Sequence, residues 1–135
     1  MTTLRDILLA EARFQHSYAE SDSQGRGPAD GFVGLALLTT DRHVFGGHAT
    51  SENYVAAASG ALGSLAGRYK LAVESGEPTV PALEVADVVL VTSRNLDDIN
   101  PAELAVLKEK LGLAADHPIG LRRVAKAAPE PALQS

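Results

Sequence analysis

The sequence predicts a layered α/β domain whose elements run in the order α-β-β-α-β-α-(β). Three observations support this prediction. The chain has 135 residues, of which 45% are hydrophobic, and a chain of this size can bury one core without a disulfide or metal staple. Apolar residues recur at helical spacing near the N-terminus. Short apolar runs bounded by turn-forming residues then alternate with helical segments, which is typical of a layered α/β domain.

The first expected element is an amphipathic helix over residues 4–18. Thr3 is its expected N-cap, and Asp6 is the reciprocal partner of a capping box. Residues 21–31 are rich in Ser, Asp, Gly and Pro, so we expect a flexible loop there. The domain should extend over residues 1–124, with a disordered tail over 125–135 that contains two prolines.

A β-hairpin is expected next. Residues 32–39 form a short apolar run that suits a buried strand. Residues 40–42 turn the chain, and residues 43–45 return as a second strand that ends before Gly46 and Gly47.

The following segment, residues 53–70, is dominated by Ala, Gly and Ser. Its alanines favour a helix, whereas Gly60, Gly63 and Gly67 each cost about 1 kcal/mol in a helix interior. Two explanations remain open for these glycines. Neighbouring strands could pack closely on the helix backbone, or helices of two subunits could meet there.

The C-terminal part contains one more helix between two strands. Residues 83–92 are hydrophobic and β-branched, which predicts a central strand. Pro101 begins a helix over residues 101–111 with Asn100 as its cap. Residues 119–124 are expected to form an edge strand.

Composition excludes several classes of function. The chain has twelve Lys and Arg residues and seventeen Asp and Glu residues, so its net charge is −5. This negative charge disfavours binding to nucleic acid or to an anionic membrane surface. The absence of cysteine removes thiolate chemistry. No apolar run is long enough to cross a bilayer, and the N-terminus has no signal-peptide pattern. We therefore expect a cytoplasmic protein with no nucleic-acid or membrane partner.

Several short motifs resemble the cytidine deaminase family across nearly the whole chain. Their number, order and spacing carry the resemblance, and residues 99–105 occupy the place of the family's Pro-Cys-Gly-x-Cys loop. The matching motifs are Tyr18-Ala19, VGLALLT (33–39), VFGG (44–47), Glu52-Asn53 and AVESG (72–76). The resemblance implies a cytidine deaminase-like layered domain with a mixed central sheet.

The zinc ligands of that family are missing from this chain. The resemblance places the two loop cysteines at Ala102 and Ala105, and the third ligand with its catalytic Glu near residues 61–65, which read Ala-Leu-Gly-Ser-Leu. Such a site needs three ligands from Cys, His or carboxylate groups, and none is present. We therefore expect no metal and no cofactor, and no zinc-dependent deamination.

A second resemblance covers a smaller part of the chain. Residues 35–69 are similar to the strand-strand-helix unit of regulatory and dimerisation domains of the isopropylmalate synthase type. This similarity spans only about a third of the chain and leaves the N-terminal helix unexplained, so we prefer the deaminase-like interpretation.

The candidate catalytic residues are His48, Glu52 and Glu103. His48 follows two glycines at the end of the hairpin, although it could also be a structural histidine. In the family, the residue at the position of Glu52 contacts sugar hydroxyls. Helix capping by Ser51, with Glu52 in the first turn of the helix, explains the presence of Glu52 equally well. The resemblance puts Glu103 beside the position of the missing zinc. Partial burial there would raise the pKa of its carboxyl group and suit it to act as a general acid or base. Its alternative role is to stabilise the helix dipole.

Asn53 and Phe32 are the candidate ligand-binding residues. An amide beside a carboxylate can bind the polar edge of a small molecule, since the amide both donates and accepts hydrogen bonds. The other three histidines, His16, His43 and His117, are expected at the surface.

Two functions from different classes follow. One is a zinc-independent enzyme of specialised metabolism that binds a small nitrogenous metabolite and transforms it by proton transfer, cyclisation or elimination. The other is a non-catalytic binding or assembly subunit with a residual pocket. In both cases we expect a homodimer or homotetramer, because family members are oligomeric.

Overall fold

The computed structural model describes residues 3–22, 32–49, 53–94 and 96–124. Its helices and strands follow the predicted α-β-β-α-β-α-β order, with one short 3-10 helix added before the last α-helix. The elements are α1 (Leu4–Asp22), β1 (Val33–Thr39), β2 (Val44–Ala49), α2 (Tyr54–Glu74), β3 (Val85–Thr92), η1 (Leu96–Asp98), α3 (Pro101–Leu111) and β4 (Gly120–Arg123). The predicted flexible loop beyond Asp22 and the predicted tail lie outside the described residues.

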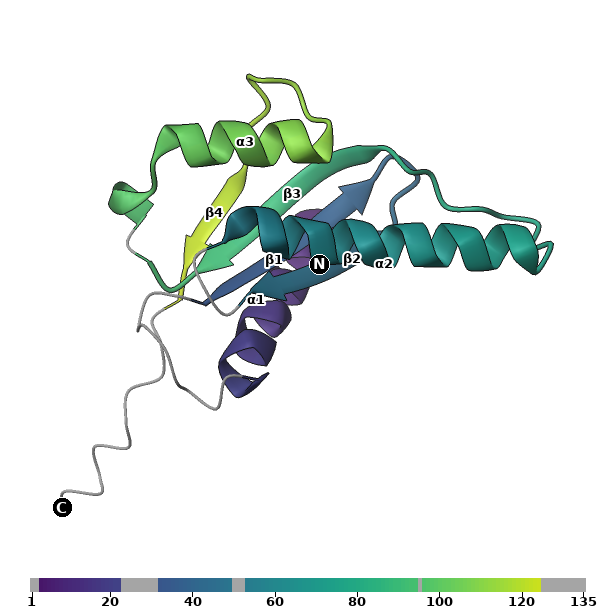
Figure 1. Cartoon of the computed structure of the whole chain (residues 1–135), viewed down its shortest axis with the longest axis horizontal. Coiled ribbons are helices and arrows are strands. Elements are labelled where there is room, and N and C mark those ends of the chain that lie inside the picture. The colour runs from purple at the N-terminus through teal and green to yellow at the C-terminus, as the bar shows by residue number, and fades with distance from the viewer. Residues whose placement is uncertain (1–2, 23–31, 50–52, 95, 125–135) are drawn as a thin grey trace, which may run out of the picture.

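The four strands form one mixed sheet in the order β2-β1-β3-β4 (Figure 1). β1 pairs antiparallel with β2 on one side and with β3 on the other, whereas β3 and β4 are parallel. β1 and β3 are therefore the interior strands, and β2 and β4 are the edges.

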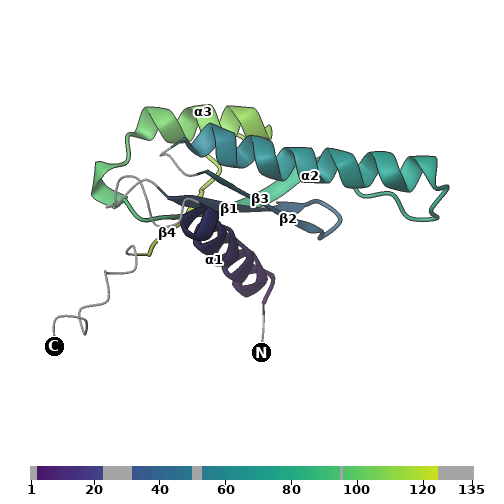
Figure 2. The ribbon, with the colours of Figure 1, turned by 60° about the horizontal axis from the view of Figure 1, so that its bottom comes forward.

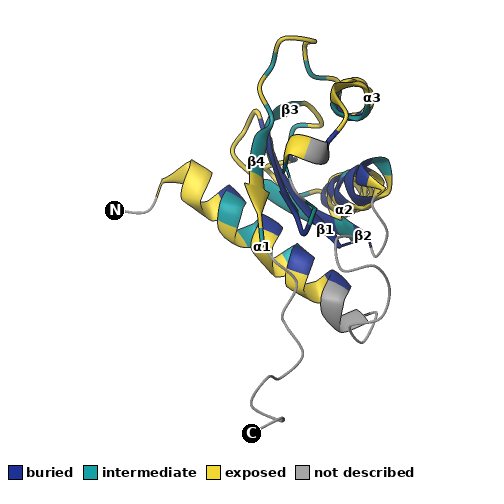
Figure 3. Cartoon of the chain, turned by 90° about the vertical axis from the view of Figure 1, so that its left-hand side faces the viewer, coloured by how far each residue is buried: buried dark blue, intermediate teal, exposed yellow. Residues whose placement is uncertain are grey.

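The helices cover both faces of the sheet. Figure 2 shows α1 on one face and α2 with α3 on the opposite face, so the fold has three layers. Because side chains alternate along a strand, Leu35 and Leu90 pack toward α2 and α3, while Ala36 and Val91 pack toward Leu8 on α1. The outer surfaces of α1 and α2 are exposed (Figure 3).

β2 is longer than predicted, because it continues through Gly46 and Gly47 to Ala49. The two glycines do not end the strand, since helices approach it closely from both faces. A Cβ on Gly46 would lie 2.7 Å from the side-chain nitrogen of Gln15 on α1, and a Cβ on Gly47 would lie 2.5 Å from the backbone nitrogen of Ala61 on α2. At Gly47 the Cβ would clash with the backbone of α2, so only glycine fits there without moving a helix, whereas at Gly46 the side chains of Glu11 and Gln15 would have to move.

The predicted helix caps are present at two of the three helices. Thr3 and Asp6 form the reciprocal capping box of α1, with N–H···O distances of 3.0 and 3.1 Å. Asn100 caps α3 by accepting a hydrogen bond from the backbone N–H of Ala102 at 2.9 Å. The cap of α2 is Asn53, which accepts from the backbone N–H of Ala56 at 3.0 Å, while Ser51, the cap in one of the two explanations of Glu52, lies outside the described residues.

Both long helices extend past their predicted ends. α1 continues beyond residue 18 to Asp22, and α2 continues beyond residue 70 to Glu74. Over the described part of the chain, none of the helices combines the length and apolar character that a membrane span requires.

Candidate functional site

The candidate site is a cavity of about 310 Å³ at the outer edge of β2, between α1 and α2. We call it the edge cavity. Eight residues line it, three from α1, three from β2 and two from α2: Phe14, Gln15, Tyr18, Gly46, Gly47, His48, Gly60 and Ser64. Its volume lies at the lower end of the range for small-molecule sites.

The backbone of β2 forms part of the cavity wall. The N–H of Thr39 donates to the carbonyl of His43 at 2.9 Å, which fixes the phase of the antiparallel β1–β2 ladder. Hydrogen-bonded and non-hydrogen-bonded pairs alternate along such a ladder. The N–H and C=O groups of Val44 and Gly46 therefore point away from β1 toward the outer edge. Since Gly46 also lines the cavity, it offers a donor and an acceptor without a side chain in the way.

His48 is held by a chain of polar contacts to α1. The Nε2 amide of Gln15 donates to the carboxylate of Glu11 at 2.7 Å, which turns the amide oxygen toward the imidazole. That oxygen lies 3.1 Å from Nδ1 of His48. Because an amide oxygen only accepts hydrogen bonds, Nδ1 carries the proton and the tautomer of His48 is set by Gln15.

Two aromatic rings of α1 form the wall beside His48. The ring of Tyr18 lies 4.8 Å from the imidazole of His48, centroid to centroid, at a tilt of 42°. Phe14 contacts Tyr18 edge-on with centroids 6.1 Å apart. Phe14 is 58% exposed and Tyr18 is 50% exposed, so a ligand could still cover much of both rings.

The sheet separates two of the candidate residues that the sequence analysis grouped together. His48 points to the α1 face, where it meets Gln15 and Tyr18. Glu103 lies in the first turn of α3, which packs on the opposite face (Figure 2). Its carboxylate pairs with Arg94 at 3.3 Å and is 43% exposed. His48 and Glu103 therefore do not share one site in the structure.

The remaining candidates also have structural partners or lie outside the described residues. Asn53 caps α2 through its side-chain oxygen, and Glu52 is outside the described residues. Phe32 is fully buried, and its ring meets the ring of His16 edge-on with centroids 6.3 Å apart. In this position Phe32 is part of the interior and not of an open binding surface.

The expectation that His16 is at the surface is wrong. His16 is 1% exposed, and its Nε2 lies 2.6 Å from the hydroxyl oxygen of Ser93 at the end of β3. Burial of an imidazole requires a hydrogen-bond partner, and Ser93 supplies it. Of the other two histidines, His43 pairs with Asp41 at 3.1 Å and His117 pairs with Asp87 at 3.3 Å.

The donor set required by zinc is not found in the described residues. No three His, Asp or Glu side chains in this part of the chain gather closely enough to hold a metal ion. Ala102 and Ala105, at the places that the resemblance gives to the loop cysteines, are exposed and carry no donor atom. The described residues therefore do not fit the zinc of that family.

The α1 contribution to the site does not follow from any of the candidate motifs. The helical pattern of residues 4–18 places Phe14, Gln15 and Tyr18 on a helix but gives them no role at a site. The sequence signal that could have found them is the pair of large aromatic residues, Phe14 and Tyr18, four positions apart on one side of a helix.

The arrangement in the edge cavity suits binding of a small planar polar molecule. It combines aromatic faces, an imidazole with a fixed tautomer, a hydroxyl at Ser64 and the backbone edge of Gly46. No protein-family model, curated protein or solved structure matches this chain.

Proposed function

We propose that this chain is a cytidine deaminase-like protein that works without zinc and binds a small planar nitrogenous metabolite in the edge cavity. The observation that carries this proposal is the convergence of Tyr18, His48 and the backbone edge of Gly46 on one cavity between two helices. The family motifs quoted above and the α-β-β-α-β-α-β order of the elements support the fold part of the proposal.

The outward N–H and C=O groups of Gly46 are the reason why we propose a nitrogenous ligand. A strand-edge residue presents an N–H donor and a C=O acceptor side by side. A lactam, amide or amidine edge offers the complementary pair. Tyr18 and Phe14 supply apolar faces for the planar body, and Ser64 supplies a hydroxyl at the α2 side.

Binding is favoured over catalysis by what lines the cavity. Among the lining residues, His48 carries the imidazole, the group that enzymes most often use as a general acid or base. Glu11 lies behind Gln15, whose amide separates the carboxylate from the imidazole. Glu103 lies across the sheet. A reaction at this site is thus limited to proton transfer by His48, which supports isomerisation, cyclisation or elimination of a reactive ligand and not hydrolysis of an unactivated one.

A thermal-shift screen tests the proposal. Nucleobases, nucleosides and amino-acid-derived amides are added in the presence of EDTA, which removes contaminating zinc. A ligand present at ten times its Kd stabilises the folded form by about 1.4 kcal/mol, which raises Tm by roughly 4–6 °C.

Two tyrosine variants locate the binding site. Tyr18→Ala should weaken binding of any hit at least tenfold, because it removes the ring that lies against His48. Tyr69→Ala is the matched control, since Tyr69 is an exposed tyrosine on α2 that does not line the cavity. Equal binding by both variants, or a hit that needs added zinc, would refute the proposal.

An assembly subunit is the second candidate function. Residues 53–67 at the start of α2 contain no charged side chain, and Cβ atoms added at Gly63 and Gly67 would meet nothing within 4 Å. Depletion of charge is typical of the core of subunit interfaces. A homodimer or homotetramer that buries this surface would explain both features, and light scattering that finds only monomer at micromolar concentration would refute it.

A further inference from the structure

A second cavity, of about 280 Å³, lies at the turn end of the hairpin. We call it the hairpin cavity, and it shares no lining residue with the edge cavity. Three segments that are separate in the sequence form it: the hairpin turn with the start of β2, the C-terminal half of α2, and the loop that joins α2 to β3. The lining residues are His43, Val44, Phe45, Arg68, Thr79 and Pro81.

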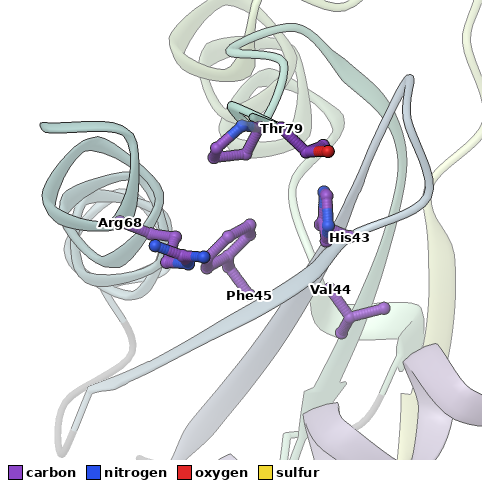
Figure 4. Close-up of a pocket in the computed structure, with 6 residues that line it drawn as sticks. His43, Val44, Phe45, Arg68 and Thr79 are labelled. Carbon is purple, nitrogen blue, oxygen red and sulfur yellow. The ribbon is translucent and has the colours of Figure 1, made fainter. Parts of the chain in front are cut away.

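The walls of this cavity divide into an apolar part and a cationic or hydroxyl part. Figure 4 shows Arg68 beside the ring of Phe45, with His43 across from them and Thr79 above. The apolar surface comes from the side chains of Phe45 and Pro81, because the Val44 side chain packs on the α1 face of the sheet, and none of the six lining residues is acidic. A mostly apolar lining with a few converging polar groups is typical of a small-molecule site.

Arg68 is held in place from outside the cavity. Its Nη2 pairs with the carboxylate of Glu77 at 2.7 Å, and the two side chains are 43% and 34% exposed. A guanidinium carries five N–H donors in a planar fork, so an ion pair through one nitrogen leaves donors for a second carboxylate. The pair with Glu77 restricts Arg68 before any ligand arrives, which lowers the entropic cost of binding.

His43 is held in the same manner by Asp41. Its Nδ1 lies 3.1 Å from the carboxylate, which also accepts hydrogen bonds from the hydroxyl of Thr39 and, at 2.9 Å, from the backbone N–H of Ala82. The Thr39 hydroxyl is the main reason why the pKa of Asp41 is lowered to about 2. Asp41 therefore stays ionised, and it connects the turn that bears His43 to the loop that bears Thr79 and Pro81.

We propose that the hairpin cavity binds a small organic monocarboxylate whose body is an apolar ring. The ring would lie on Phe45 and Pro81, and the carboxylate would accept hydrogen bonds from Arg68 and from the hydroxyl of Thr79. A planar carboxylate matches the guanidinium fork. Glu77 and Asp41 stand just behind the two basic side chains and repel a doubly charged group more strongly, so phosphate is the poorer ligand.

Benzoate, benzamide and inorganic phosphate are the probes for this proposal. Their binding to the full chain is followed by NMR at constant ionic strength and pH. We expect benzoate to shift the resonances of Phe45, Thr79 and the Arg68 side chain. Benzamide, which has the same shape without the charge, should bind at least tenfold more weakly, and phosphate should not displace benzoate at equal concentration.

Two arginine variants provide the specific test and its control. Arg68→Gln should weaken benzoate binding at least tenfold. Arg42→Gln removes the same charge from an exposed residue next to His43 that does not line the cavity, and it should change the affinity less than twofold. A melting curve of each variant confirms that it is folded.

Several outcomes would overturn the proposal. Equal affinity for benzoate and benzamide would show a merely apolar pocket, and displacement of benzoate by phosphate would show an unspecific anion site. Equal losses in Arg68→Gln and Arg42→Gln would show a general charge effect. Because Tyr18→Ala leaves the hairpin cavity intact, benzoate binding by that variant separates this proposal from the one for the edge cavity.

Discussion

Replacing Gly63 and Gly67 of α2 by alanine distinguishes an isolated subunit from an assembled one. In the single chain, the new methyl groups would meet nothing within 4 Å. Both positions are in the interior of a helix that extends from Tyr54 to Glu74. Glycine in an exposed helix interior is less favourable than alanine by about 1 kcal/mol, because its backbone loses more freedom on folding.

The double variant should therefore be more stable than the parent by about 2 kcal/mol if the chain is a monomer. For a domain of this size the gain corresponds to a rise in Tm of roughly 6–10 °C. If α2 instead packs against a second subunit through these glycines, the methyl groups would push the two backbones apart. The variant would then lose stability, and the loss would depend on protein concentration.

Urea unfolding followed by circular dichroism, at two protein concentrations that differ a hundredfold, measures both effects. Gly47→Ala serves as a contrasting variant, because its Cβ would lie 2.5 Å from the backbone nitrogen of Ala61 and should lower stability by about 1–3 kcal/mol. If light scattering shows a monomer and the double variant is still no more stable than the parent, the argument from open space around Gly63 and Gly67 is wrong.

Two further predictions concern single side chains. Asp41→Asn should lower stability at pH 7, since the pKa of Asp41 is lowered from 3.8 to about 2 in the folded chain. Its ionised form therefore stabilises the fold above about pH 4, and this contribution is lost as the pH falls through about 2. Urea midpoints of parent and variant should converge between these pH values, and a constant difference would contradict the assignment. Tyr54→Phe should raise the free energy of unfolding by about 1–2 kcal/mol, because the buried Tyr54 hydroxyl finds no hydrogen-bond partner among the described residues. A loss of stability in the same urea assay would show that the hydroxyl has a partner in solution.

The elements that depend on local chemistry were predictable from the sequence. The caps by Thr3 and Asn100 and the buried runs of β1 and β3 follow from residues within one or two turns. The end of β2 was not predictable in this way. Gly46 and Gly47 are typical of a turn, but here they pair with Ala36 and Leu35 of β1, and the close neighbours from α1 and α2 are far away in the sequence.

The candidate site was predicted less well, for a reason of distance along the chain. His48 was found because it follows the hairpin glycines, but its partner Gln15 is 33 positions away and no local pattern connects them. His16 was misplaced for the same reason, since its partner Ser93 is 77 positions away. His48 and Glu103 were both candidates for one site, but they lie on opposite faces of the sheet. A strand pattern shows that side chains alternate between the two faces, but it does not show on which face each helix lies.

The central position of β1 also has a consequence for the order in which the chain folds. Its pairing with β2 needs only the closure of a short turn, in which Arg42 adopts a positive φ of 70°. Its pairing with β3, which joins Val33 to Thr92, needs the closure of a long loop that contains α2, and such non-local contacts form slowly. We therefore expect the β1–β2 hairpin to be formed in the folding transition state, and β4 to join the sheet after it. Destabilising substitutions in the hairpin turn should then slow folding, whereas those in β4 should speed unfolding.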